Sequence, residues 1–208
     1  TDFRLRQTFG PFAIRAGRVN LEPDLMFRDR PLRMLEIFRL ALEQNADVHP
    51  QALQRITRGL HALGESTRND PQAAAEFLAI LTSKHNPERV LRLMNESGVL
   101  GRFLPDFGKI VAMMQFDMYH SFTVDEHTIQ VIGILHQIES GGLAKTAPVA
   151  TAVMPEIDAR RALFVAALLH DIAKGRDGDH SELGAELALD VCPRLGLTPE
   201  ETETVSWL

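Results

Sequence analysis

The sequence contains almost no cysteine, which limits how the fold can be stabilised. Cys192 is the single cysteine among 208 residues, so no disulfide can form within the chain. No set of cysteines and histidines has the spacing of a zinc finger either. A chain of this length can bury a sizeable apolar core without cross-links or a structural metal. We therefore expect a globular protein from a reducing, cytoplasmic setting.

Long apolar runs and an excess of basic residues are absent as well. No window reaches the roughly 18 consecutive apolar residues of a membrane span, and Thr1–Arg6 lacks the pattern of a signal peptide. Lysine and arginine number 22 against 28 acidic residues, which gives a formal net charge of −6. This balance argues against nucleic-acid binding through a broad basic surface. The chain lacks an initial methionine and stops just after a new helix start, which predicts a piece of a longer protein.

The start of the chain carries the only extended pattern. Phe12 and Ile14, and then Val19 and Leu21, fall on alternate positions, with a turn expected at Ala16–Gly17. We interpret these strands as a hairpin or as the edge of a preceding domain.

From residue 31 onward, apolar side chains recur at steps of three and four, which is the spacing of amphipathic helices. Helices are expected after Pro31, Pro50, Pro71 and Asn86–Pro87, because proline suits the first turn of a helix. Short loops separate these segments. We therefore interpret residues 31–115 as a helical linker bundle.

A longer helix is expected to begin beyond this bundle. Thr123 followed by Glu126 three residues later is the pattern of a capping box. His127, Val131 and Leu135 then share one face of the predicted helix, so we expect the His127 side chain to point inward.

Two further helices follow, and a third is expected to begin at Thr198–Glu201 and to be cut off at Leu208. The segment of roughly 158–173 is rich in alanine and leucine and ends with His170 and Asp171, and the following helix begins at His180. We predict an all-α chain, with two successive helical bundles and a short extended remnant at the amino terminus.

The histidines of these helices suggest a metal site. His170 and Asp171 alone are weak evidence, because a buried pair of this kind is often only structural. The imidazoles of His127, His170 and His180 together with the Asp171 carboxylate form a donor set that suits a divalent cation. Asp171 could bridge two such ions through its two oxygens.

Lys174 follows His170 by one turn and allows two interpretations. Its ammonium could meet a phosphate oxygen, or it could simply be a favourable cation at a helix carboxyl end. His120 and Asp117 could likewise support the site or merely cap a loop.

Three segments resemble a known family: residues 119–128 (YHSFTVDEHT), 170–175 (HDIAKG) and 178–186 (GDHSELGAE). They are similar to the HD-domain metal-dependent phosphohydrolases. Within these, they resemble the bifunctional enzymes that uridylylate and deuridylylate the PII nitrogen-signalling protein. The similarity extends upstream through residues 95–105 and 32–40, so it covers most of the chain.

The resemblance implies a site and a cofactor. His127, His170, Asp171 and His180 would hold a divalent metal, Mg²⁺ or Mn²⁺, and Asp171, His170 and Lys174 would take part in hydrolysis. A later aspartate ligand of the family would fall beyond the last residue. We therefore expect weak or no activity from this chain by itself.

The resemblance also implies the domain organisation and the partners. Residues 1–30 would be the edge of a preceding nucleotidyltransferase domain, and residues 116–208 the amino-terminal portion of an HD domain. The partners would be PII and its UMP-modified form, with glutamine acting through domains outside this chain and with neither nucleic acid nor membrane involved.

Two other functions stay open at this point. The chain could belong to a different HD enzyme that hydrolyses nucleotides or cyclic dinucleotides. It could also be a non-catalytic helical interaction module whose histidines are core residues.

Overall fold

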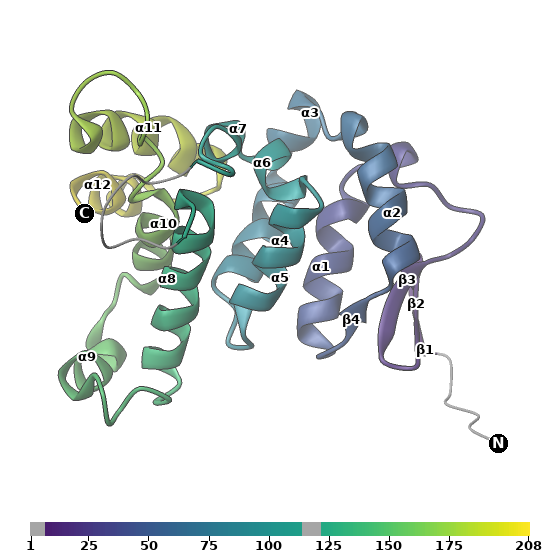
Figure 1. Cartoon of the computed structure of the whole chain (residues 1–208), viewed down its shortest axis with the longest axis horizontal. Helices are drawn as coiled ribbons and strands as arrows, with labels where there is room; N and C mark the ends of the chain where they lie inside the picture. Colours follow the sequence, from purple (N-terminus) through teal and green to yellow (C-terminus); the bar gives the residue numbers. More distant parts are fainter. Residues whose placement is uncertain (1–6, 114–121) are drawn as a thin grey trace.

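The computed structural model describes residues 7–113 and 122–208. A small sheet lies at one end, and the helices follow one another from it to the opposite end, where the chain finishes (Figure 1). The predicted all-α class with a short extended start is confirmed.

The sheet has four strands in the order β1-β2-β3-β4. Their bounds are β1 Gln7–Phe9, β2 Phe12–Arg15, β3 Arg18–Leu21 and β4 Asp47–Val48. The predicted hairpin is confirmed: Ala16 and Gly17 form its two-residue turn, with φ of 50° and 73°. Such left-handed values match the twist of a tight hairpin. The strand β4 was not predicted; it has two residues and pairs in parallel with β3.

Short helices fill the middle of the chain, and three of them begin at the predicted Pro50, Pro71 and Pro87, whereas the helix expected after Pro31 begins at Arg33. They are η1 Phe27–Asp29, α1 Arg33–Glu43, α2 Pro50–Gly59, η2 Leu60–Ala62, α3 Glu65–Arg68, α4 Pro71–Leu81, α5 Pro87–Glu96, α6 Val99–Phe103 and α7 Pro105–Gly108. His49, Asp70 and Asn86 cap α2, α4 and α5 through side-chain hydrogen bonds to backbone N–H groups. Each cap satisfies a donor that the helix start leaves open.

The last part of the described chain consists of longer helices and two short ones. They are α8 Val124–Glu139, α9 Pro148–Val153, η3 Met154–Glu156, α10 Arg160–Leu169, α11 His180–Arg194 and α12 Pro199–Trp207. Packing proceeds in a series: α1 packs against α4 and α5, α5 against α8, α8 against α10, and α10 against α12. A common apolar core joins all of them. The domain boundaries proposed at residues 30 and 115 stay predictions.

The predicted capping box at Thr123 is wrong. Thr123 is the N-cap of α8, but its side chain makes no capping hydrogen bond. Glu126 instead forms an ion pair with Arg92 of α5. A charged partner on a packed neighbouring helix thus replaces the local bond. A complete capping box does occur where α12 begins, between Thr198 and Glu201.

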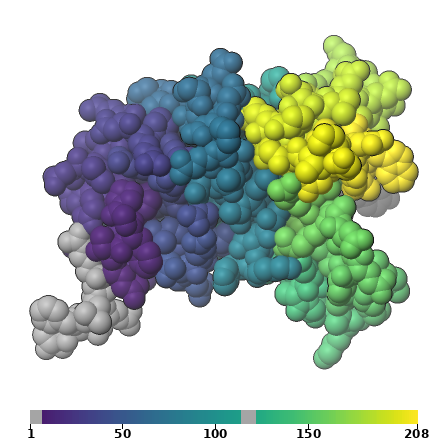
Figure 2. Space-filling view, turned by 180° about the vertical axis from the view of Figure 1, so that it is seen from behind, coloured from purple at the N-terminus to yellow at the C-terminus, as the bar shows by residue number. Residues whose placement is uncertain are grey.

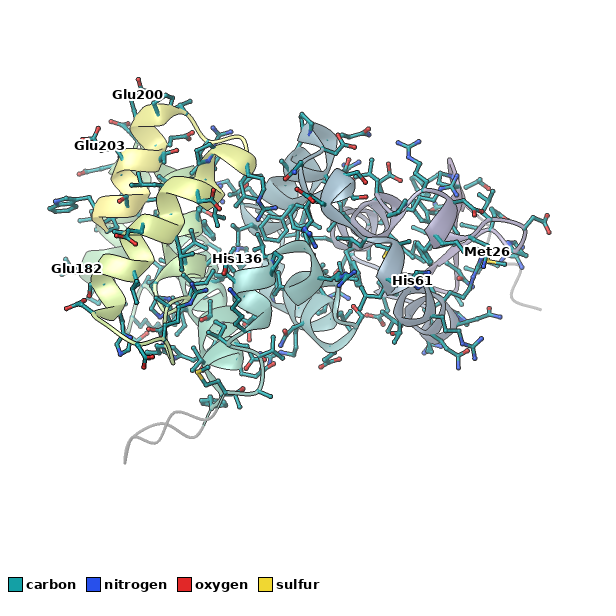
Figure 3. The ribbon with its side chains drawn as sticks, turned by 90° about the horizontal axis from the view of Figure 1, so that it is seen from above. Met26, His61, His136, Glu182, Glu200 and Glu203 are labelled. Atoms are coloured by element: carbon teal, nitrogen blue, oxygen red, sulfur yellow. The ribbon has the colours of Figure 1, made fainter. Side chains whose placement is uncertain are left out.

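The surface at the carboxyl end is acidic. Figure 3 shows Glu182, Glu200 and Glu203 pointing outward from α11 and α12, at the end of the molecule opposite Met26 and His61. Within residues 7–113 and 122–208, no helix is long and apolar enough to cross a membrane.

Three elements meet at Glu139, the last residue of α8. Its carboxylate accepts hydrogen bonds from Arg160, the first residue of α10, and from Lys84 in the loop after α4, at 2.5 Å for Lys84. The hydrogen bond from Arg160, aided by Lys84 and opposed by burial, lowers the pKa of Glu139 to about 2. The ionised form therefore stabilises the fold.

We expect Glu139→Gln to lower the free energy of unfolding at pH 7 by about 1 kcal/mol, as for a partly exposed ion pair. The folded-state pKa lies below the ordinary 4.5, so this contribution is complete above pH 4.5 and is lost as the pH falls towards 2. Urea unfolding followed by circular dichroism at several pH values measures the difference. Glu156→Gln, at an exposed position, serves as the control. A difference that persists unchanged at pH 2.5 would contradict the assignment.

Candidate metal centre

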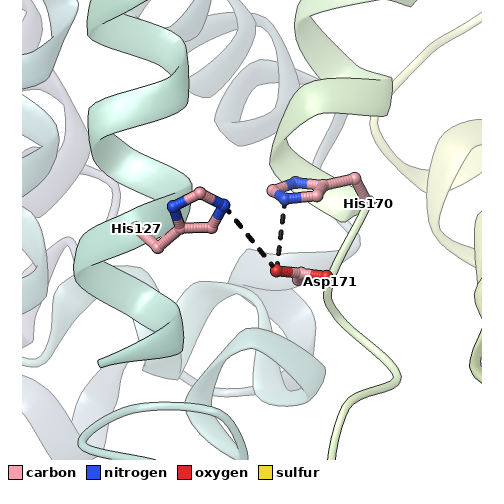
Figure 4. A group of neighbouring side chains, drawn as sticks. All are labelled: His127, His170 and Asp171. Carbon is pink, nitrogen blue, oxygen red and sulfur yellow. Dashed lines mark ion pairs between the residues drawn. The ribbon is translucent and has the colours of Figure 1, made fainter. Parts of the chain in front are cut away.

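Packing of α8 against α10 brings two histidines and one aspartate together. His127 lies in the first turn of α8, His170 directly follows the last residue of α10, and Asp171 comes next. One ligand atom from each of the three lies within 4.8 Å of the others. Figure 4 shows the imidazole rings of His127 and His170 beside each other, with one oxygen of the Asp171 carboxylate close to both. Residues far apart in the sequence therefore share one site.

The distances fit a divalent cation. Asp171 Oδ2 lies 3.2 Å from His170 Nε2 and 4.0 Å from His127 Nε2. The two rings meet edge to face, with centroids 5.5 Å apart. Around an octahedral ion with bonds near 2.1 Å, neighbouring ligand atoms lie about 3 Å apart and opposite ones about 4.2 Å. The three donors thus suit one ion, with coordination positions left over for water or substrate.

A backbone carbonyl sets the orientation of the His170 ring. Nδ1 of His170 lies 2.7 Å from the carbonyl oxygen of Ala167. Because the carbonyl only accepts, Nδ1 carries the hydrogen, and in the neutral ring Nε2 keeps the lone pair that a metal needs. A hydrogen bond of this kind typically supports a metal-binding histidine.

Asp171 is ionised at neutral pH although it is largely buried. Burial alone would raise its pKa, but hydrogen bonds from His170 and Lys174 outweigh that effect and lower the pKa to about 2. Lys174 Nζ lies 2.8 Å from Oδ2. Burial also opposes protonation of His170, yet its hydrogen bonds to Asp171 and to the Ala167 carbonyl raise its pKa above 6.5.

The other predicted residues are His180, His120 and Asp117. His180 is exposed as the first residue of α11, and among the described residues it is not part of the three-residue group. Its role as a ligand stays a prediction. His120 and Asp117 lie outside the described residues.

The predicted inward face of α8 is only partly correct. His127, Val131 and Leu135 are half-buried, whereas Val124 and Thr128 are among the residues that are fully buried. The buried stripe is therefore turned away from His127. This rotation leaves His127 at the border of the core, where it can face a ligand.

Sequence reasoning missed the residues that support this site. Asp125 is 4% exposed and accepts hydrogen bonds from Asn95 at 2.7 Å and from the Ala112 N–H at 3.2 Å. Arg176 pairs with Asp106 at 2.7 Å and so fixes the loop after Asp171 to α7. An acidic residue in the first turn of a helix is usually exposed to solvent. The spacing of residues along the sequence therefore does not indicate that Asp125 is buried.

Two family models match the chain, and together they define the class of protein. Residues 12–103 match the family model described as "Uridylyltransferase GlnD third domain", and residues 124–208 match the HD domain model. The candidate centre lies wholly within the second match. The chain thus combines a segment similar to the third domain of the uridylyltransferase family with a segment similar to an HD domain.

The curated relatives identify particular enzymes that the chain resembles. The chain is 54% identical over 203 residues to the bifunctional uridylyltransferase/uridylyl-removing enzyme of Azospirillum brasilense, and 50% identical to that of Novosphingobium aromaticivorans. Each match covers 98% of this chain and 22% of the relative. The chain is therefore homologous to a segment that makes up about a fifth of the length of each of these bifunctional enzymes. The resemblance predicted from the sequence is confirmed.

Asp171→Asn should weaken Mn²⁺ binding by at least about 100-fold. Loss of a residue that only supports a metal ligand can already cost about 100-fold in affinity, and Asp171 is expected to be a ligand itself. The substitution keeps the shape of the side chain but removes the charge that attracts the cation. Isothermal titration calorimetry measures the affinity, and circular dichroism checks that the helices remain. Asp177→Asn, at an exposed position in the same loop, should bind Mn²⁺ like the wild type. Unchanged affinity in Asp171→Asn would make the aspartate purely structural.

Mn²⁺ affinity should fall as the pH decreases, because only neutral imidazole binds a metal. Since the pKa of His170 is raised, the decline should begin above pH 6.5. His127→Phe keeps the ring volume at a half-buried position, so we expect normal stability with weaker binding. In this variant, Mn²⁺ competes with protons at one imidazole instead of two, so the affinity should change less steeply with pH. Equal pH dependence in both proteins would remove His127 from the ligand set.

Proposed function

We propose that this chain carries the metal-dependent uridylyl-removing site of a bifunctional PII-modifying enzyme. The observation that carries the proposal is the meeting of His127, His170 and Asp171 beside Lys174, inside the segment that matches the HD domain. The printed names of the relatives, which include uridylyl removal, support the same activity.

The substrate would be PII with UMP attached to a tyrosine through a phosphodiester. Hydrolysis forms a new bond between phosphorus and a water oxygen and breaks the bond to the tyrosine oxygen. A bound divalent cation, Mg²⁺ or Mn²⁺, would supply water activation and charge neutralisation.

The residues of this chain would take separate parts in that reaction. His127, His170 and Asp171 would hold the cation, with His180 as a further candidate. Lys174 now pairs with Asp171 and would turn to a non-bridging phosphate oxygen once a cation neutralises the carboxylate. Because the side chain of Asp171 is 12% exposed, its charge acts in a partly water-free environment, where such interactions are stronger.

Glutamine would act through parts of the enzyme other than this segment. The chain spans 22% of the length of the relatives, so the uridylylating site is also proposed to lie outside it.

The test is release of UMP from UMP-modified PII by the Mn²⁺-loaded chain. We expect slow release, because the ligands described here leave the cation under-neutralised, and at least 100-fold slower release by Asp171→Asn. Asp177→Asn should match the wild type.

Free nucleotides and cyclic dinucleotides, tested side by side, should be poor substrates. Preferential hydrolysis of either would assign the chain to a different HD enzyme. Metal binding without hydrolysis of any of these substrates would favour a non-catalytic interaction module.

A further inference from the structure

A cavity lies away from the candidate metal centre. Its volume is about 590 Å³, and it forms where α4 meets the start of α10 and the end of α11. Small and apolar residues make most of its wall, among them Pro71, Ala74, Ala75, Leu78, Pro193 and Leu195. In the rear view of Figure 2, the yellow carboxyl-terminal helices lie beside the blue part of the chain. None of the residues lining this cavity belongs to the candidate metal centre.

Two arginines line the cavity, and their bonding differs. Arg161 is engaged with the carboxylate of Glu201, and that hydrogen bond raises the pKa of Arg161. Arg194 is half-buried and, within residues 7–113 and 122–208, forms no ion pair with a carboxylate. Burial, together with the nearby charge of Arg68, lowers the pKa of Arg194, and the charges of Asp190 and Asp106 offset this only in part. In the described residues, the acceptors that contact the Arg194 guanidinium are thus backbone carbonyls and not carboxylates.

The hydrogen bonds of Arg194 use one side of its guanidinium. Nη1 donates to the carbonyl oxygens of Arg68 at 3.2 Å and Phe103 at 3.4 Å. The guanidinium carbon also lies 5.7 Å from the ring centroid of Phe103. In the described part of the chain, Nε and Nη2 have no protein acceptor. These two groups form an edge that binds a carboxylate or a phosphate with two parallel hydrogen bonds.

We propose that this cavity binds a small molecule bearing a carboxylate or phosphate group. Nε and Nη2 of Arg194 hold the anionic group, and the remainder of the molecule lies against the α4 wall. The volume falls within the usual range for small-molecule sites, and an apolar wall with few polar groups is typical of them. The wall of α4 lies in the first matched segment and Arg194 lies in the HD segment, so the ligand touches both.

The test is an NMR titration of the ¹⁵N-labelled, metal-free chain with sodium phosphate and, separately, with sodium acetate. Sodium chloride at equal ionic strength corrects for salt effects. We expect saturable shifts of the amide signals of Ala75, Leu78 and Gly196 with at least one anion. A response to phosphate alone or to acetate alone identifies which anionic group the site takes.

Arg194→Lys keeps the charge but loses the two-donor edge, so it should weaken binding at least tenfold. Ala75→Trp fills the cavity from an exposed helix position and should abolish the shifts. Arg58→Lys and Gln54→Trp, at exposed positions of α2, are the matched controls and should change nothing.

Three results would overturn the proposal. They are the absence of saturable shifts in the wild type, shifts confined to the signals of His170 and Lys174, and unchanged binding in Ala75→Trp. The Ala75→Trp comparison decides the question even if Arg194→Lys does not fold.

Discussion

The packing of α8 against α10 is the contact on which the candidate centre depends. Both helices contribute fully buried side chains to one core, among them Ile129, Ile132 and Phe164. Protein interiors are close-packed, so the volumes of these side chains fix the separation of the two helices. That separation places the rings of His127 and His170 with centroids 5.5 Å apart. The chemistry of the site thus rests on apolar packing.

The Asp171 carboxylate is the electrostatic centre of this arrangement. Its Oδ2 lies close to both His170 Nε2 and Lys174 Nζ, at 3.2 and 2.8 Å. A partly buried charge is tolerated where donors surround it, and here they keep the group ionised. A negative charge close to two imidazoles attracts a divalent cation, and in its absence the Lys174 ammonium compensates the charge.

Polar contacts at both ends of α8 determine which way His127 faces. Asp125 bonds to Asn95 and Ala112 at the start of the helix, and Glu139 pairs with Arg160 at its end. These bonds fix the rotation of the helix about its axis. The sequence could not reveal this rotation, because several overlapping sets of apolar positions in α8 have helical spacing. The prediction for His127 was therefore right about the helix and only partly right about the face.

The sequence by itself determined the local structure and the types of donor. Proline and capping residues specified the helix starts at Pro50 and Pro71, and Ala16–Gly17 specified the hairpin turn, because these preferences act within a few residues. The sequence also supplied the histidines and Asp171 as candidate ligands. Only the tertiary structure decided that His127, His170 and Asp171 meet while His180 lies on the surface. Distances between separate helices depend on the packing of the whole core, which no local pattern encodes.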